Sequence, residues 1–290
     1  MADFLNTIDV LGDEAVADSL IDRTITEFKD NRMTTVGANA FCGCTALTSV
    51  ELPNATELGD SAFDRCTAMT VFEFPNVLKT RNSVFGNNKE IVSLRLPKAT
   101  ALGKSQVVSY SKLEELYIPM VKTIDNYGFT GCGRLKKEKC DFSSLETVTG
   151  SNVFYQSGLG PIIDCFPSLK TVGAQMFADS SVTAADLPMA EKINQLAFSA
   201  NWNFRTLVLR RTDTVCVLDN ISALTSGQFK SGGTGGVLIV PSALVTAYTE
   251  ATNWSILYGY GTNRFLPLED YTVDGTTTGA IDWDKVNALF

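Results

Sequence analysis

The feature that most constrains this chain is a repeat with a period of 22 residues. Prolines recur at this spacing at Pro53, Pro75, Pro97 and Pro119. An aromatic series keeps the same step at Phe41, Phe63 and Phe85, with Val107 and Phe129 in the next two places. An aliphatic series runs through Ile25, Leu47, Met69, Ile91, Leu113 and Leu135. Because three residue classes share one period, the chain is predicted to be an array of similar supersecondary units.

The register loosens in the second half of the array. Phe129, Phe154, Phe177 and Phe198 follow one another at steps of 25, 23 and 21 residues. Insertions around Lys136–Glu146 and Gly158–Pro161 account for the longer steps. The repeat is therefore expected to run from Ile25 to Arg210.

Each unit contains a short stretch in which apolar and polar residues alternate, as at Val50, Glu51 and Leu52. This alternation predicts a strand, and the proline that follows ends strand pairing because it lacks an N–H group. The preceding segment GANAFCGC is too short for a stable helix. Stacked units can bury their apolar faces in one core. We therefore expect an α/β repeat solenoid of about nine rungs, with a parallel β-sheet on one face and short turns or 3₁₀ pieces opposite.

The motif AF-x-x-C-x-x-L-x-x-V-x-L-P resembles the BspA-type subfamily of leucine-rich repeats. Residues 36–135 match it closely, and residues 136–210 match it with insertions. Residues 207–269 resemble the C-terminal cap, and residues 1–28 the N-terminal cap, of BspA-type proteins from gut Firmicutes and their prophages. The resemblance implies a right-handed leucine-rich-repeat superhelix. It also implies a protein that binds a partner rather than one that catalyses a reaction.

Four segments follow from these patterns: an N-terminal cap over residues 1–24, repeats over 25–210, a C-terminal cap over 211–269 and a polar, acidic tail over 270–290. Asp13 is suited to cap a short helix in the first segment. The C-terminal cap is expected to hold a glycine-rich turn at 232–236, a strand at 237–240 and a helix from Pro241 to about Ala251, with Trp254 as its anchor. The tail is expected to pack loosely, with Trp283 and Leu289 as attachments.

Composition excludes several classes of function. The chain of 290 residues has no histidine, which removes Ser-His-Asp and Cys-His catalysis and histidine zinc sites. A net charge of −8 argues against nucleic acid as a partner. The sequence contains no run of eighteen apolar residues, so no membrane insertion is predicted. The N-terminus lacks the features of a signal peptide, so a virion-associated location and a cell-surface location reached by another route both stay open. No catalytic residue, cofactor or metal is predicted.

Cysteines occupy one repeat position at Cys44, Cys66 and Cys132, which Asn88 and Tyr110 fill in other units. Seven cysteines at irregular spacing are a poor disulfide framework, so these three are predicted to be buried, reduced thiols. The run SGGTGG lacks the Lys-Ser/Thr pair of a phosphate-binding loop, and DYTVDG lacks the ligand spacing of a calcium loop.

The outward-pointing strand residues are the predicted ligand-binding face. Alternation directs Val50 and Leu52 into the core, and it directs to the outside Ser49, Glu51, Val71, Glu73, Ser93, Arg95, Glu115 and Tyr117. The same rule extends the face weakly to Lys137, Lys139, Asp186, Thr206 and Val208. Arg95, Glu115 and Tyr117 combine charge with an aromatic ring, which suits recognition.

Three functions are compatible with this sequence. The first is a non-catalytic binding or adhesion module that recognises a protein or glycan through the sheet face, although any single outward residue could simply be solvated. The second is a structural or host-recognition component of a phage or prophage. The third is an enzyme that uses a carboxylate pair without histidine.

Overall fold

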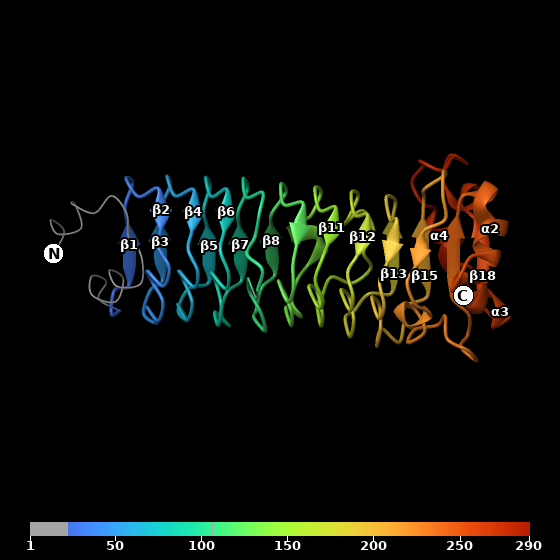
Figure 1. Cartoon of the computed structure of the whole chain (residues 1–290), viewed down its shortest axis with the longest axis horizontal. Coiled ribbons are helices and arrows are strands. Elements are labelled where there is room, and N and C mark those ends of the chain that lie inside the picture. The colour runs from blue at the N-terminus through green and yellow to red at the C-terminus, as the bar shows by residue number, and fades with distance from the viewer. Residues whose placement is uncertain (1–22, 106) are drawn as a thin grey trace.

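The computed structural model describes residues 23–105 and 107–290. They form an elongated rod in which parallel strands succeed one another from β1 to the helices at the C-terminal end (Figure 1). The predicted N-terminal helix beginning at Asp13 lies outside the described residues, as does almost all of the predicted N-terminal cap.

A row of parallel strands along one side of the rod, here called the primary row, confirms the predicted sheet. It comprises β1 (Glu27–Lys29), β3 (Ser49–Glu51), β5 (Val71–Glu73), β7 (Ser93–Arg95), β8 (Glu115–Tyr117), β10 (Cys140–Asp141), β13 (Ala184–Leu187), β15 (Thr206–Leu209), β17 (Val237–Val240) and β18 (Arg264–Pro267). An isolated bridge between Ile162 and Ala185 marks one further turn. The repeat region is therefore a parallel-strand solenoid of about nine turns, as predicted.

A second, unpredicted row of parallel strands lies on another side of the core and is here called the secondary row. Its two-residue strands are β2 (Thr35–Val36), β4 (Glu57–Leu58), β6 (Lys79–Thr80), β9 (Thr123–Ile124), β11 (Thr147–Val148), β12 (Thr171–Val172), β14 (Lys192–Ile193) and β16 (Val217–Leu218). A bridge between Lys79 and Ala101 extends β6 to the next turn. Many neighbouring turns are thus hydrogen-bonded through strands of both rows, and the primary row is interrupted between β3 and β5 and between β10 and β13.

Phenylalanines form the centre of one continuous hydrophobic core. The Phe41 ring stacks on Phe63 with 4.9 Å between centroids, and Phe63 lies 6.1 Å from Phe85. A second series continues from Phe129 through Phe154 and Phe177 to Phe198 at 5.8, 6.0 and 5.5 Å. The 22-residue spacing of this residue type is therefore the spacing at which successive turns bring their rings into contact.

The bends that carry these phenylalanines contain residues in the left-handed region of the Ramachandran plot. Seven residues with positive φ stand two positions before a core phenylalanine, namely Asn39, Ser61, Ser83, Tyr127, Asn152, Gln175 and Leu196. L-residues adopt this conformation at a cost of about 1–2 kcal/mol. Backbone hydrogen bonds between turns offset that cost, as where Phe41 N–H donates to the Ala62 carbonyl at 2.8 Å.

The structure corrects the register of one turn. Val108, and not Val107, occupies the phenylalanine position, because its N–H donates to the Gly128 carbonyl at 2.9 Å, as Phe129 N–H does to Val153. Consequently Ser111, and not Tyr110, occupies the cysteine position, and its Oγ lies 3.5 Å from Cys132 Sγ. Tyr110 instead has a φ of 47° and is 58% exposed.

The buried side chains at the cysteine position also donate hydrogen bonds to the preceding turn. Cys66 Sγ donates to the Phe41 carbonyl at 3.1 Å, and Asn88 Nδ2 donates to the Phe63 carbonyl at 2.8 Å. The prediction of buried, reduced thiols at Cys44, Cys66 and Cys132 is confirmed. The position selects a small side chain that can donate to a backbone carbonyl between turns.

The C-terminal cap continues the solenoid and then closes it. The strand predicted at 237–240 is β17, and the helix predicted after Pro241 consists of η4 (Ser242–Leu244) and α2 (Val245–Glu250). Trp254 begins α3 (Trp254–Gly259), is buried, and donates from Nε1 to the Cys216 carbonyl at 2.7 Å. Three further 3₁₀ helices in the described chain are η2 (Lys137–Lys139), η3 (Ile221–Ala223) and η5 (Leu268–Tyr271).

The predicted loose packing of the tail is wrong. An antiparallel bridge joins Thr272 to Ile281, and α4 (Trp283–Asn287) follows, with the Asp282 carboxylate accepting from the Lys285 N–H at 3.1 Å. Ile281 and Val286 pack with Val208, Val237, Ile239 and Leu268 in a separate small core on the outward face of the primary row. Trp283 and Leu289, the expected attachments, lie partly buried against it.

Candidate functional site

The eight residues predicted to bind a ligand lie on the outward face of the primary row, and we call them the polar ladder: Ser49, Glu51, Val71, Glu73, Ser93, Arg95, Glu115 and Tyr117. Strand pairing sets Val71, Ser93 and Glu115 side by side. It also sets Glu73, Arg95 and Tyr117 side by side, with Asp141 following Tyr117. The structure therefore brings the central residues together in two parallel lines across three strands.

Arg95 is the centre of the polar ladder. Its guanidinium forms an ion pair with Glu115 and lies 3.8 Å from a Glu73 carboxylate oxygen. Its Cζ stands 4.6 Å from the centroid of the Tyr117 ring. Ser93 Oγ donates to the second Glu115 oxygen at 3.0 Å. These contacts hold the guanidinium and the ring in one orientation, as a preformed recognition surface requires.

Accessibility differs strongly along the polar ladder. The Glu51 and Glu73 side chains are more than half exposed, and Val71 is 48% exposed. Ser93 is only 7% exposed, so it supports Glu115 rather than offering a contact of its own. Acidic side chains on or beside the ladder outnumber basic ones by five to two. The acidic ones are Glu27, Glu51, Glu73, Glu115 and Asp141, and the basic ones are Lys29 and Arg95. The surface is therefore acidic and rich in hydrogen-bond acceptors.

The weaker extension of this face is wrong in two ways. Lys137 and Lys139 belong to the 3₁₀ helix η2, and Asp141 in β10 is the residue that pairs with Tyr117. Asp186, Thr206 and Val208 do belong to the primary row, but they are 3%, 2% and 0% exposed. The small core formed with the tail removes Val208 from solvent, so the open part of the face ends before β13.

A groove lies where the tail meets the primary row. It has a volume of about 770 Å³ and is lined by Asp164, Pro167, Pro188, Met189 and Glu191 from the turns, by Asp186, Arg210, Arg211, Thr212 and Asp213 at the strand ends, and by 277–280 of the tail. Sequence patterns did not reveal it, because it needs residues of the tail beside residues of three earlier turns.

Arg210 joins the two walls of this groove. Its Nε donates to both Asp186 carboxylate oxygens at 2.9 and 3.1 Å, and Nη1 donates to the Gly279 carbonyl at 2.6 Å. Burial raises the pKa of Asp186, and the hydrogen bonds from Arg210 oppose that rise. The Asp186 carboxylate in turn raises the pKa of Arg210. The pair fixes the tail to the sheet and is a structural contact.

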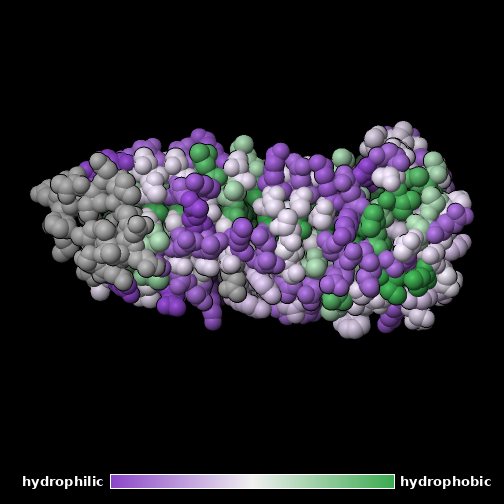
Figure 2. Space-filling view, in the orientation of Figure 1, coloured by the Kyte–Doolittle hydropathy of each residue, from purple (hydrophilic) through white to green (hydrophobic). Residues whose placement is uncertain are grey.

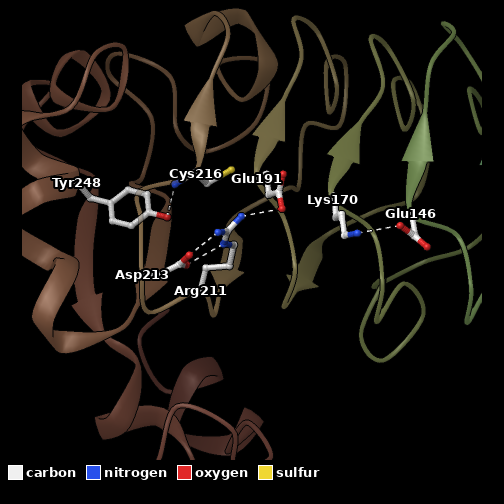
Figure 3. A network of polar contacts seen from close by, with 7 residues as sticks. All are labelled: Glu146, Lys170, Glu191, Arg211, Asp213, Cys216 and Tyr248. Atoms are coloured by element: carbon white, nitrogen blue, oxygen red, sulfur yellow. Dashed lines mark hydrogen bonds and ion pairs between the residues drawn. The ribbon is translucent and has the colours of Figure 1, made fainter.

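Ion pairs link successive turns along an edge of the rod beside the secondary row (Figure 3). Glu146 accepts from Lys170 at 2.8 Å and from Lys122 at 3.1 Å, which lowers the pKa of Glu146. Further along, Arg211 bridges Glu191 at 2.8 Å and Asp213 at 2.6 Å. The signs alternate from turn to turn, so the charges satisfy one another and this edge is better explained as a structural element than as a site.

The surface changes between the middle of the rod and its C-terminal end. On the face seen in Figure 2, hydrophilic side chains cover much of the middle, and hydrophobic ones gather toward the C-terminal end. Within the residues that the structure describes, no group of three or more acidic or cysteine side chains has the arrangement of a metal site. No helix in the same residues has the length and apolar character needed to span a bilayer.

Burial suppresses the reactivity of the cysteines. Desolvation raises the pKa of Cys132 and Cys165 to about 11 and that of Cys140 and Cys216 to about 12. Thiolates are the nucleophilic form, so these thiols are unsuited to nucleophilic catalysis.

Alkylation tests this conclusion. At pH 8 a thiol with a pKa of about 11 is almost entirely protonated. Burial raises the pKa of Cys42 as well, but Cys42 is only half-buried, so we expect iodoacetamide to label it in the native protein well before the buried Cys132, as measured by mass spectrometry of digests. Equal rates at the two positions would contradict the buried-thiol assignment.

The raised pKa values of the buried thiols also make the stability of the fold depend on pH. Thiols of the unfolded chain ionise near pH 9, so the contribution of the buried thiols to stability is complete below that pH and is lost as the pH rises through about 11 to 12.

The fold and surface define a class of protein: a solenoid of stacked turns that exposes an extended sheet face. The family model for the BspA type leucine-rich repeat region matches residues 18–136 and 108–205, in six copies. The chain therefore belongs to the BspA-type leucine-rich repeat family. Proteins of this family are typically binding or adhesion modules and are generally non-catalytic.

Solved structures that are similar to the chain include three bacterial leucine-rich repeat proteins. A leucine-rich cell surface protein from Faecalibacterium prausnitzii is 15% identical, with 89% of this chain and 82% of that chain covered and a TM-score of 0.41. A leucine-rich repeat protein from Bacteroides ovatus is 15% identical, with 84% of each chain covered and a TM-score of 0.40. One from Eubacterium ventriosum is 14% identical, with 71% and 84% covered and a TM-score of 0.30. A search of curated proteins gives no match.

Proposed function

We propose that this protein is a non-catalytic binding module that recognises a protein or glycan through the polar ladder. The observation that carries the proposal is the arrangement around Arg95, whose guanidinium lies over the Tyr117 ring and beside Glu115 and Glu73. Arginine and tyrosine are enriched among residues that dominate binding energy. Here both are held in place before a ligand arrives.

The acidic character of the polar ladder favours particular ligand groups. Glu51 and Glu73 have exposed carboxylates, and Val71, in the same strand as Glu73, offers an exposed apolar contact beside them. Carboxylates accept hydrogen bonds from lysine and arginine side chains and from sugar hydroxyls. A basic protein segment or a neutral glycan therefore fits this surface better than an acidic one.

A triple replacement tests the proposal. Changing Arg95, Glu115 and Tyr117 together to alanine removes the central contacts without leaving one member of the ion pair alone. We expect binding on a combined protein and glycan array to fall at least about tenfold. We expect the melting temperature to change little, because exposed ion pairs contribute only about 0–1 kcal/mol.

The matched control removes an exposed ion-pair cluster from the secondary row. Glu57 pairs with Lys79 at 2.9 Å and with Arg81 at 2.7 Å, and changing all three to alanine should leave binding intact. Unaltered binding by the Arg95, Glu115 and Tyr117 variant would exclude the polar ladder as the recognition surface.

A structural or host-recognition role in a phage or prophage is the alternative, and it rests on the likeness of the caps to prophage-encoded proteins. Such a role would also use the polar ladder as a contact surface. The neighbouring genes discriminate between the two: tail or baseplate genes support the phage role, and export or surface-anchor genes support adhesion.

A further inference from the structure

A second cavity lies on the opposite side of the tail from the groove at Arg210, at the edge where strands of the primary row begin. Its volume is about 560 Å³. Its polar lining consists of Thr183, Asn203, Arg205, Gln228, Thr234 and Arg264, and Leu289 and Phe290 complete the wall. No carboxylate side chain lines it. In a chain with a net charge of −8, a polar cavity lined by two arginine side chains and by no acidic side chain differs from the surrounding surface.

The strand register brings the two arginines to the same edge. Arg264 begins β18 and pairs with Val237 in β17, which pairs with Thr206 in β15. Arg205 directly precedes Thr206. The two guanidiniums thus approach one cavity from strands separated by β17.

These arginines differ from others in the described chain by their partners. Arg81, Arg95, Arg210 and Arg211 each form an ion pair with a carboxylate. Across residues 23–105 and 107–290, neither Arg205 nor Arg264 forms an ion pair with a carboxylate. A guanidinium carries five N–H donors. Arg205 Nη2 donates to Asn287 Oδ1 at 3.4 Å. Arg264 Nη2 donates to the Leu289 carbonyl at 2.8 Å.

The Phe290 ring holds both guanidiniums in place. Arg205 Cζ lies 4.2 Å from the ring centroid, and Arg264 Cζ lies 5.7 Å from it. Such cation–π contacts orient a guanidinium without neutralising its charge. Gln228 Oε1 accepts from the Thr234 hydroxyl and from its N–H at 3.3 Å, which fixes the opposite wall. The donors are therefore arranged before any ligand is present.

We propose that this cavity binds an oxyanion group, such as a carboxylate, sulfate or phosphate. Two positioned guanidiniums can each form paired N–H···O bonds to such a group, and the threonine, asparagine and glutamine side chains can supply further polar contacts. The cavity lies on a different part of the face from the polar ladder, so the proposal does not rest on the proposed function.

Calorimetric titration of the full chain at low ionic strength tests this inference. The probes are inorganic phosphate, inorganic sulfate and glucuronate, whose comparison shows whether a tetrahedral or a carboxylate group is preferred. We expect saturable binding of at least one probe, with affinity that falls as salt is added. Absence of binding by all three would overturn the proposal.

Variants locate the site. The double variant Arg205→Gln/Arg264→Gln should weaken binding at least about tenfold. The matched control Lys104→Gln/Arg134→Gln removes the same charge from two exposed positions elsewhere and should retain affinity within about twofold. Equal loss in both double variants would show general attraction and overturn the site.

A conservative variant covers the case in which the double variant does not fold. Arg264→Lys keeps the positive charge but loses the paired donor geometry, and it should weaken binding by several-fold with an unchanged circular dichroism spectrum. Wild-type affinity in this variant and in Arg205→Lys would overturn the proposed role of the guanidiniums.

Discussion

Replacing Phe63 by alanine is expected to lower the free energy of unfolding by about 3–5 kcal/mol, because a buried aromatic ring is lost and a cavity forms. The Phe63 ring is fully buried and has centroid distances of 4.9 to 6.1 Å to four neighbouring rings, those of Phe41, Phe72, Phe74 and Phe85. The measurement is urea-induced unfolding followed by circular dichroism and tryptophan fluorescence.

Tyr127→Ala is the control for this prediction. Tyr127 stands two positions before Phe129 in another turn and is 45% exposed, so its loss should change stability by no more than about 0.5 kcal/mol. The tryptophans all lie in the C-terminal part, so their fluorescence also reports whether damage at Phe63 is transmitted along the core. A Phe63→Ala cost no larger than that of Tyr127→Ala would contradict the assigned stacking.

Replacing Arg210 by methionine is expected to cost about 3–5 kcal/mol at neutral pH, because the Asp186 carboxylate is left buried and unpaired. The change also removes the hydrogen bond to the Gly279 carbonyl and so weakens the attachment of the tail. Unfolding in urea and limited proteolysis between 272 and 290 measure the two effects.

The pH dependence of this variant has a defined sign. Without Arg210, burial raises the pKa of Asp186 in the folded state, while the unfolded value stays near 3.8. The part of the deficit that comes from the unpaired Asp186 charge is therefore absent below the unfolded pKa and grows as the pH rises through the folded pKa, while the part that comes from the lost hydrogen bond to Gly279 remains at every pH. Each unit by which the folded pKa of Asp186 exceeds the unfolded pKa corresponds to ~1.4 kcal/mol of lost stability. A deficit that is independent of pH between 4 and 7 would contradict this account.

Two further variants isolate the buried pair. Asp186→Asn combined with Arg210→Met should recover much of the stability, because the uncompensated charge is then absent. Arg81→Met breaks an exposed ion pair with Glu57 and should cost no more than about 1 kcal/mol. Similar losses for Arg81→Met and Arg210→Met would show that burial of the pair is unimportant.

The sequence predicted those features that leave a periodic trace. A strand such as Ser49–Glu51 alternates outward and inward residues, and stacked turns repeat that alternation at a fixed spacing. The polar ladder followed from the same rule. The secondary row was missed because a two-residue strand such as Glu57–Leu58 is too short to show alternation.

The errors have equally specific causes. Val107 and Val108 are the same residue type, so the one-residue shift between them leaves no trace in composition. The tail contains few apolar residues among many polar ones, and Ile281, Trp283, Val286 and Leu289 become a buried set only when α4 turns them toward the sheet. The contacts of Arg210 and Arg264 with the tail depend on this packing and could not be predicted without it.

The second row of strands has a mechanical consequence. Hydrogen bonds between turns run along two sides of one core, so bending toward either side must compress or stretch one of the rows. Nine turns at the strand spacing of about 4.8 Å give a stiff length of roughly 40 Å. The repeat region therefore holds the polar ladder at a fixed distance from the helices at the C-terminal end of the rod.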